Sequence, residues 1–391
     1  MALLIAYSVR NFWRRRVTMG FTVAGLGLVV FVFVAVLMLA HGLETALVST
    51  GTSENAIVLR KGASTEMASG VYRDQTQILR ALPEVASEQG GQGRAAAELV
   101  VLLNLRKRGA AAPANVMLRA VTPESLTLRP QVRLTAGRML HPGTTEIITG
   151  AQIARRFQHA GLGDTLRLGK RDWTVVGVFE AGGSAFESEI WGDADQMMAA
   201  YGREAFSSVT LRLPMPADLE RLRARMESDP RLSSLQVKRE RDYYEDKSGM
   251  MAAFIRLVGL ALTLVFCIGA ALGAAITMYG AVANRTAEIG MLRTLGFSPR
   301  TILAVFLTES LALGTAGWVA GVASASLLQS VTISTTNWGT FSELAFGFVL
   351  SPRIAAQGLL FGLVMALAGG FLPAMRASRL KIVDALAERA A

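Results

Sequence analysis

Four long apolar segments divide the chain, one ahead of a polar block (residues 41–250) and three behind it. Val17–Ala40 contains 24 residues without a charge, and Leu257–Ala283 and Ile354–Met375 are equally free of charge. Each exceeds the roughly 20 residues that a helix needs to cross a bilayer core. A fourth segment, 301–330, carries one acid, Glu309, in a run that is otherwise apolar and rich in Ala and Gly. The pattern predicts four transmembrane helices around one large domain.

The Lys and Arg residues beside these segments set the expected orientation, because cytoplasmic flanks retain positive charge. Loop 331–350 contains no Lys or Arg, whereas the other flanks carry eleven: Arg10, Arg14, Arg15, Arg16, Arg285, Arg293, Arg300, Arg376, Arg379, Lys381 and Arg389. We therefore expect both termini in the cytoplasm and the polar block on the extracytoplasmic side of a bacterial inner membrane.

The net charge of +10 belongs mostly to these flanks. The polar block itself carries 27 basic and 25 acidic residues, a balance that argues against a nucleic-acid groove. The one cysteine, Cys267, lies inside the second apolar segment. No disulfide can form within the chain, so the outer domain must be held together by its own core.

Within the polar block, short β-branched or apolar runs alternate with helical patterns, which predicts an α+β domain. The predicted strands are Asn55–Lys61, Glu98–Leu105, Asn115–Val121, Thr145–Thr149, Asp172–Phe179, Ser207–Leu213 and Ser234–Arg239; the predicted helices are Arg73–Ala81, Ala151–Gln158, Asp193–Tyr201 and Ala217–Ser228. Helical patterns at 44–49 and 242–250 suggest a two-helix stalk.

The expected fold is thus an α-helical membrane protein with one transmembrane helix before, and three after, a large α+β extracytoplasmic domain. The predicted segments are an N-terminal cytoplasmic segment 1–16, helix 17–41, the extracytoplasmic domain with its stalk 42–250, helix 251–283, a cytoplasmic helix 284–300, helix 301–330, an outer loop 331–352, helix 353–375 and a cytoplasmic tail 376–391.

The cytoplasmic segment 284–300 is long enough for about three helical turns. Ile289, Leu292 and Leu295 fall at i, i+3 and i+6 and form one apolar stripe. Gly296 can end this helix, and Ser298 with Pro299 can begin the next. On these residues alone, a helix that docks in a partner's groove and a helix that lies on the membrane surface are equally good interpretations.

The block RTAEIGMLRTLGFSPRTI (285–302), Glu309 with the two residues after it, the Gly-rich third helix and the closing LPAMRASRLKIVDAL (372–386) resemble the FtsX-like permeases of MacB-type (type VII) ABC transporters. The resemblance extends over nearly the whole chain and implies a MacB-type core as the outer domain. Two outer-domain blocks, SENAIVLRKGA (53–63) and ESEIWGDADQM (187–197), look closest to stand-alone DevC-like permeases. One departure is Ile382, where many relatives have proline.

The resemblance implies a mechanism in which a coupling helix docks on an ABC ATPase. The positions that match this coupling segment are Glu288, Ile289, Gly290, Leu292, Arg293, Leu295 and Gly296. The sequence contains no G-x-x-x-x-G-K-[ST] motif, the phosphate-binding loop of ATPases. We therefore expect a separate ATPase subunit, working as a dimer, to bind and hydrolyse ATP with Mg²⁺. We expect this chain itself to have no enzymatic activity and to bind no cofactor. A second permease copy, most simply as a homodimer, and a periplasmic adaptor with an outer-membrane channel are further implied partners.

Other polar residues give weaker signals. Glu309 would lie about 12 Å into its helix, so both pairing near the cytoplasmic end and a substrate or proton path remain open. The acidic residues Glu187, Glu189, Asp193 and Asp195 lack the Gly and terminal Glu of an EF-hand loop, and the three histidines have no metal-ligand spacing. We predict neither a metal site nor catalytic residues, and the pattern identifies no substrate-binding residue.

Three functions fit this organisation. The first is export, in which ATP-driven movement is transmitted to the outer domains (mechanotransmission). The second is an FtsX-like regulator of an extracytoplasmic partner such as a cell-wall hydrolase. The third is lipoprotein extraction, as in LolC and LolE relatives. The outer domain is larger than that usual in FtsX proper, which favours the first over the second.

Overall fold

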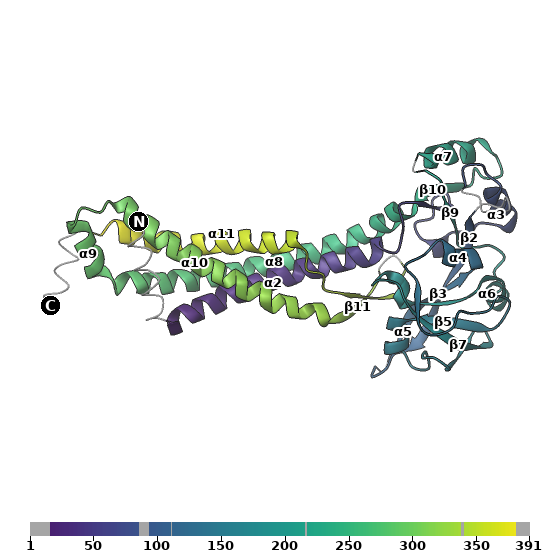
Figure 1. Cartoon of the computed structure of the whole chain (residues 1–391), viewed down its shortest axis with the longest axis horizontal. Coiled ribbons are helices and arrows are strands. Elements are labelled where there is room, and N and C mark those ends of the chain that lie inside the picture. The colour runs from purple at the N-terminus through teal and green to yellow at the C-terminus, as the bar shows by residue number, and fades with distance from the viewer. Residues whose placement is uncertain (1–15, 86–93, 111, 216, 338–339, 381–391) are drawn as a thin grey trace. The chain divides into compact units, whose positions relative to one another are not determined.

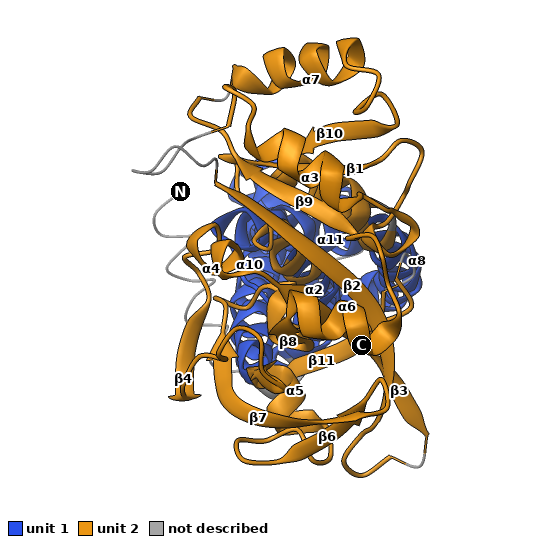
Figure 2. Ribbon diagram, turned by 90° about the vertical axis from the view of Figure 1, so that its right-hand side faces the viewer, with its two compact units in different colours: residues 1–41, 253–331, 348–391 blue, residues 42–252, 332–347 orange. Residues whose placement is uncertain are grey.

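A computed structural model describes residues 16–85, 94–110, 112–215, 217–337 and 340–380. The described residues divide into two compact units (Figure 2). One, here called the membrane unit, comprises residues 1–41, 253–331 and 348–391; the other, the outer domain, comprises residues 42–252 and 332–347. The expected segment 1–16 and the tail beyond residue 380 lie almost wholly outside the described residues.

Four helices in the described chain are long and apolar enough to span a membrane, as the sequence predicts. They belong to α2 (Arg16–Val48), α8 (Glu240–Ala283), α10 (Pro299–Ser326) and α11 (Pro352–Ser378), and the short α9 (Thr286–Thr294) joins α8 to α10 (Figure 1). A short 3-10 helix, Leu327–Ser330, extends α10. Helices α2 and α8 both continue into the outer domain, since the boundary between the units falls within each of them.

Glycines let the membrane helices approach closely. A Cβ atom added to Gly314 of α10 would lie 2.9 Å from the Gly362 carbonyl oxygen and 2.6 Å from the Ala366 Cβ, both on α11. A Cβ on Gly321 would lie 2.7 Å from the Gly27 carbonyl oxygen of α2. Lipid provides no hydrophobic drive between helices, so this close packing is what holds them together.

We expect Gly314→Val to destabilise the membrane unit by about 1–3 kcal/mol, because the added side chain has no space at the α10–α11 contact. Thermal unfolding in detergent measures this effect. Gly273→Val on α8 is the matched control, since nothing lies within 4 Å of a Cβ built there. Equal melting temperatures for the two variants would contradict this packing.

The outer domain is built on a ten-stranded mixed sheet with the strand order β10-β1-β9-β2-β3-β8-β5-β7-β4, to which β6 adds beside β7. The strands are β1 (Asn55–Arg60), β2 (Ala95–Arg106), β3 (Pro113–Val121), β4 (Arg133–Gly137), β5 (Glu146–Gly150), β6 (Thr165–Leu168), β7 (Arg171–Glu180), β8 (Glu189–Asp193), β9 (Ser208–Arg212) and β10 (Leu235–Arg239). The pairs β3–β8 and β5–β7 are parallel, and the others are antiparallel. The predicted α+β class is confirmed.

The central strands are buried at nearly every position, as in β1 and β8, whereas β7 alternates between buried and more exposed residues, as a strand with one covered face does. In β7, Trp173, Val175 and Phe179 are all fully buried. Five helices accompany the sheet: α3 (Arg73–Arg80), α4 (Pro123–Thr127), α5 (Ala151–Arg156), α6 (Ala194–Tyr201) and α7 (Asp218–Ser228). A short 3-10 helix, Glu66–Ala68, brings an acidic side chain into the domain interior.

The chain between α10 and α11 forms an antiparallel hairpin of β11 (Thr332–Thr336) and β12 (Glu343–Gly347). The sequence pattern predicts only an outer loop here. The hairpin belongs to the outer domain, although the helices on either side of it belong to the membrane unit.

Candidate functional site

Helix α9 is bounded by two local signals that the sequence predicts. Gly296 adopts φ +91°, and its amide donates to the Arg293 carbonyl while the Phe297 amide donates to the Leu292 carbonyl. The Ser298 side chain then caps α10 by accepting from the Thr301 amide, with Pro299 in the first turn. These contacts fix a sharp corner between α9 and α10.

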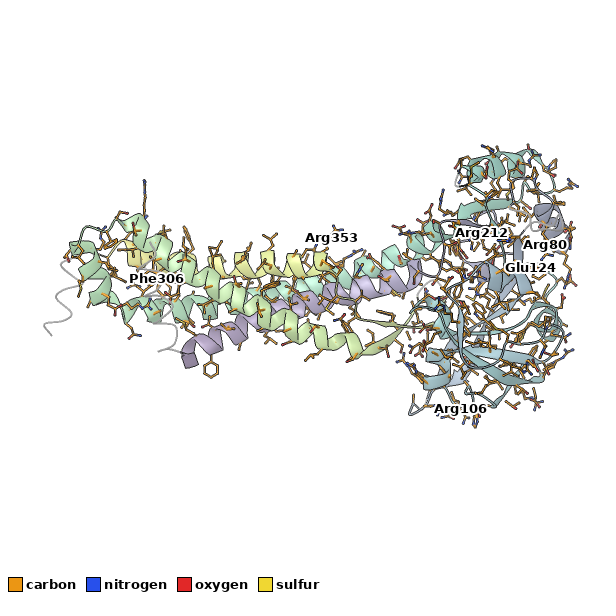
Figure 3. The ribbon with its side chains drawn as sticks, in the orientation of Figure 1. Arg80, Arg106, Glu124, Arg212, Phe306 and Arg353 are labelled. Atoms are coloured by element: carbon orange, nitrogen blue, oxygen red, sulfur yellow. The ribbon has the colours of Figure 1, made fainter. Side chains whose placement is uncertain are left out.

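The three residues of the expected apolar stripe of α9 differ in their burial. Ile289 is buried in one cluster with Val282, Ile302 and Phe306, so it anchors α9 to its neighbouring helices. Phe306 of this cluster is labelled in Figure 3. Gly290 is also buried, and Leu292 and Arg293 are half-buried. The exposed apolar surface consists instead of Met291, Leu295 and Phe297, at 51%, 70% and 37% exposure, with Glu288 and Gly296 exposed as well. The predicted stripe is therefore exposed only toward its C-terminal end, at Leu295.

Glu309, the acid inside the third apolar segment, forms an ion pair with Arg285. The Arg285 Nη1 lies 3.0 Å from the Glu309 Oε2, and both side chains are buried. Arg285 is the N-cap residue, directly before α9, and Glu309 lies in the third turn of α10. The pair therefore fixes the start of α9 to α10 from the side opposite the Gly296 corner. A buried charge requires such a partner.

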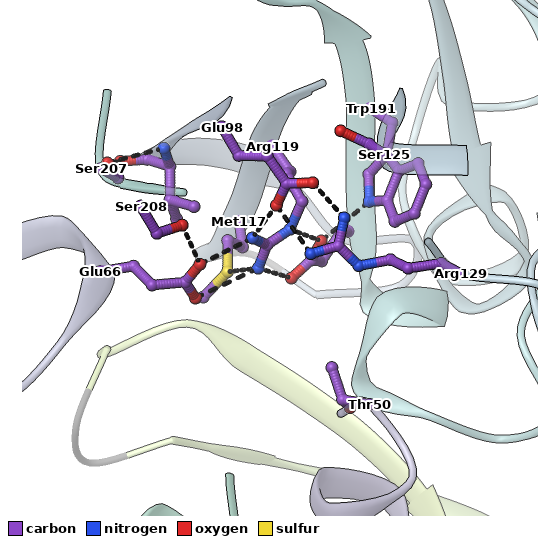
Figure 4. A network of polar contacts seen from close by, with 12 residues as sticks. Thr50, Glu66, Glu98, Met117, Arg119, Ser125, Arg129, Trp191, Ser207 and Ser208 are labelled. Atoms are coloured by element: carbon purple, nitrogen blue, oxygen red, sulfur yellow. Dashed lines mark hydrogen bonds and ion pairs between the residues drawn. The ribbon is translucent and has the colours of Figure 1, made fainter. Parts of the chain in front are cut away.

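A second group of charges, which is not among the predicted sites, lies buried in the outer domain (Figure 4). Arg119 on β3 donates to Glu66 (2.8 Å), Glu98 on β2 (2.9 Å) and Glu189 on β8 (2.8 Å). Arg129 forms a second pair with Glu98. Each of these side chains is at most 5% exposed. The one available signal is a charged residue within a strand of apolar residues, as in VMLRAV (116–121).

This buried ion network reaches the ends of α2 and α8. Glu240, the first residue of α8, lies 3.5 Å from Arg129. Its Oε2 accepts from the Thr52 amide (3.1 Å) and from the Asn55 side chain (3.0 Å), shortly after α2 ends. A Cβ on Gly51 would lie 2.7 Å from the Glu240 carbonyl oxygen, so the two chain segments are in close contact. The network thus links the chain after α2 and the first residue of α8 to the sheet.

Burial and neighbouring charges together shift the pKa values of two acids of this network in opposite directions. Burial alone would raise the pKa of Glu66, but the Arg119 guanidinium outweighs it and lowers that pKa to about 2. Burial raises the pKa of Glu240, because the single charge of Arg129 at longer range only partly offsets desolvation. The pKa of Lys247 falls to about 8, mainly through burial.

The depressed pKa of Glu66 predicts an acid-sensitive outer domain. Its contribution is fully present above the unfolded value of 4.5 and is lost as the pH falls toward 2. The loss should reach roughly 3 kcal/mol at about 1.4 kcal/mol per pH unit. Thermal unfolding of the full chain between pH 2 and 6 should show the melting temperature falling toward low pH, and Glu66→Gln should make this fall less steep. An equally steep fall in Glu66→Gln would contradict this assignment.

The four acids considered as a metal site have other partners. Glu187 accepts from the Ala181 and Gly183 amides, and Glu189 is the Arg119 partner. Asp193 caps α6, and Asp195 pairs with Arg73. Among the described residues, no group of three or more His, Cys, Asp or Glu side chains could hold a metal ion.

Comparison with known families matches nearly the full length of the chain. The model of the MacB-like periplasmic core domain matches residues 19–229, and the model of the FtsX-like permease C-terminal matches residues 260–382. The chain belongs to the MacB-type, FtsX-like permeases of ABC transporters. The predicted family is confirmed, and this permease is an inner-membrane protein with a periplasmic-type domain.

Two relatives illustrate the similarity. The permease is 28% identical over 266 residues to the macrolide export ATP-binding/permease protein MacB of Nitrobacter winogradskyi, covering 63% of this chain and 39% of that protein. It is 24% identical over 233 residues to the uncharacterised ABC transporter permease YknZ of Bacillus subtilis, covering 58% and 56%. The chain thus spans about half, or less, of these relatives' length. The solved periplasmic region of MacB from Actinobacillus actinomycetemcomitans aligns with a TM-score of 0.37 at 12% identity, over 50% of this chain and 92% of that one.

Proposed function

We propose that this permease couples ATP hydrolysis by a separate ABC ATPase to movement of its outer domain, by mechanotransmission, in an export system. The observation that carries the proposal is the geometry of α9. This short helix exposes Leu295 and Met291, and it is held to α10 by the Gly296 corner at one end and the Arg285–Glu309 pair at the other. A displacement of α9 therefore moves α10 with it instead of being absorbed by a flexible loop.

In this mechanism the outer domain is the part that the membrane helices move. Its buried ion network ties the chain after α2 and the start of α8 to the central strands β2, β3 and β8. The helices that leave the domain are thereby fixed to its sheet. Movement of α2 and α8 then turns the domain as a rigid body, because packed interiors transmit strain.

The names of two relatives support the proposed direction of transport. The matched proteins include a macrolide export protein and the pyoverdine export protein PvdT of Pseudomonas fluorescens, which is 36% identical over 105 residues, 27% of this chain and 15% of that protein. Both names support export. We further propose a dimeric ATPase that binds ATP and Mg²⁺, a second copy of this permease, and cytoplasmic termini with an extracytoplasmic outer domain. A periplasmic adaptor and an outer-membrane channel would complete an export path.

The docking of α9 is tested by co-expressing this permease with a candidate ABC ATPase subunit and measuring how much ATPase co-purifies. Leu295→Asp places a charge on the most exposed apolar side chain of α9 and should reduce recovery of the ATPase at least about tenfold. Leu162→Asp is the matched control, because Leu162 is also exposed, at 50%, but lies in the outer domain. Equal recovery with Leu295→Asp and the control would show that α9 does not dock the ATPase.

A further inference from the structure

The β11–β12 hairpin gives the outer domain a connection to the membrane helices that is separate from α2 and α8. The chain enters it from α10 and leaves it into α11. Its second strand is buried in the outer domain, with Leu344, Ala345 and Phe346 at 3–5% exposure. A lone two-stranded hairpin is at best marginally stable in water. The hairpin therefore depends on the outer domain for its structure and is expected to move with it.

Specific polar contacts hold the hairpin in place. The Ala345 amide donates to the Ser188 Oγ at 3.0 Å. The Asn115 side chain donates to the Phe341 carbonyl at 2.9 Å. A neighbouring strand residue, Ser334, accepts from the Lys107 ammonium at 3.2 Å. These bonds reach both strands of the hairpin and the turn between them.

Glu343, the first residue of β12, forms ion pairs with two basic residues of the outer domain. Its carboxylate lies 2.6 Å from the Lys107 Nζ, directly after β2, and 3.7 Å from the Arg156 Nη1 at the end of α5. The Glu343 side chain is 11% exposed, so solvent screens the pair only weakly. Lys107 and Arg156 are themselves close neighbours, because the Arg108 amide donates to the Arg156 carbonyl. One carboxylate thus joins the hairpin to two elements of the domain.

We propose that this hairpin is a second force-transmitting connection, running from α9 through α10 to the outer domain, with Glu343 as the positioning residue that fastens it to β2 and α5. The inference rests on the proposed function and deepens it. The order along the chain supports it, since α10 runs directly from the α9 corner to the hairpin. Movement driven by the ATPase is then transmitted to the outer domain at two places. The first is where α2 and α8 join the domain, and the second is the Glu343 contact. Forces applied at two places can rotate the domain as well as shift it.

Hydrogen exchange of the full chain in nanodiscs tests the contact itself. Glu343→Gln should speed exchange in residues 332–347 about tenfold, because the hairpin loses its ionic fastening. Glu220→Gln is the matched control, since it removes an exposed ion pair with Arg223 on α7. Unchanged protection of the hairpin in Glu343→Gln would overturn the inference.

Exchange in the permease–ATPase complex, with and without ATP and vanadate, tests transmission. In the wild type we expect nucleotide to alter exchange in α9, in the hairpin and in residues 104–108 and 153–157. In Glu343→Gln the response of 104–108 and 153–157 should fall by at least half while that of α9 is unchanged, and Glu343→Asp should recover part of it. A full response of these two segments in Glu343→Gln would refute the second connection and leave the proposed function standing. Absence of any α9 response in the wild type would remove the proposed function, and this inference with it.

Discussion

Arg119→Met is expected to unfold the outer domain, with a loss of about 3–5 kcal/mol or more of stability. The substitution leaves Glu66 and Glu189 buried without their guanidinium partner, and Glu98 with only Arg129. Removing one member of a buried ion group costs far more than the group's net contribution, because a charge remains uncompensated in the interior. Limited proteolysis and thermal unfolding of the full chain in detergent would measure the loss.

Two further variants serve as comparisons for Arg119→Met. Arg138→Met is the matched control, since Arg138 makes a close pair with Glu146 on the surface, where its side chain is 50% exposed; we expect a loss below about 1 kcal/mol. Arg119→Lys retains the positive charge but lacks the planar set of donors of a guanidinium. Its loss of stability should therefore lie between those of Arg119→Met and Arg138→Met. If Arg119→Met melted within a degree or two of the Arg138→Met control, the network would not hold the domain together.

Arg285→Met is expected to have the second-largest effect, and to act on coupling as well as stability. It leaves the Glu309 carboxylate buried in α10 without its partner, at a cost of about 2–4 kcal/mol by the scale for intramembrane acids. It also frees the start of α9 from α10. We expect ATP hydrolysis by the bound ATPase to continue while the outer domain ceases to respond to nucleotide. The measurement is hydrogen exchange of the outer domain in the complex, alongside the ATPase rate.

The double variant Arg285→Gln with Glu309→Gln separates stability from coupling. It removes both charges, so no buried charge is left unpaired and the melting temperature should recover much of the loss. The outer-domain response should stay weak, because an amide pair holds α9 to α10 less firmly than an ion pair. Full recovery of the response would assign Arg285 and Glu309 a purely stabilising role.

The membrane topology and most of the sheet could be predicted from the sequence because their signals are local. Hydropathy over 20 residues identifies a spanning helix without knowledge of its neighbours. Strands such as β7 show their alternation within a few residues. The α9 corner was also predictable, since Gly296, Ser298 and Pro299 act on the backbone next to them.

The parts that escaped prediction depend on partners distant in the sequence. Strand β8 is absent from the predicted strands, since it begins and ends with an acid, Glu189 and Asp193. Only Arg119, 70 residues away, explains how Glu189 can be buried. Strand β11 is rich in Thr and only partly buried, and the β11–β12 hairpin makes hydrogen bonds with the distant residues Ser188 and Asn115. The burial of Ile289 on α9 escapes prediction for the same reason: the core that it enters is formed by α8, α10 and α11.

The most direct test of the central claim is whether nucleotide moves the outer domain. Lys170→Cys in a Cys267→Ser background places one spin label on an exposed outer-domain turn of each copy, and removes the one native cysteine. Electron-paramagnetic distances between the two labels are then measured for the permease–ATPase complex in nanodiscs, without nucleotide and with ATP and vanadate. We predict a defined distance that changes with nucleotide and that Arg285→Met holds constant. An identical distance distribution in both nucleotide states of the wild type would contradict mechanotransmission by this permease.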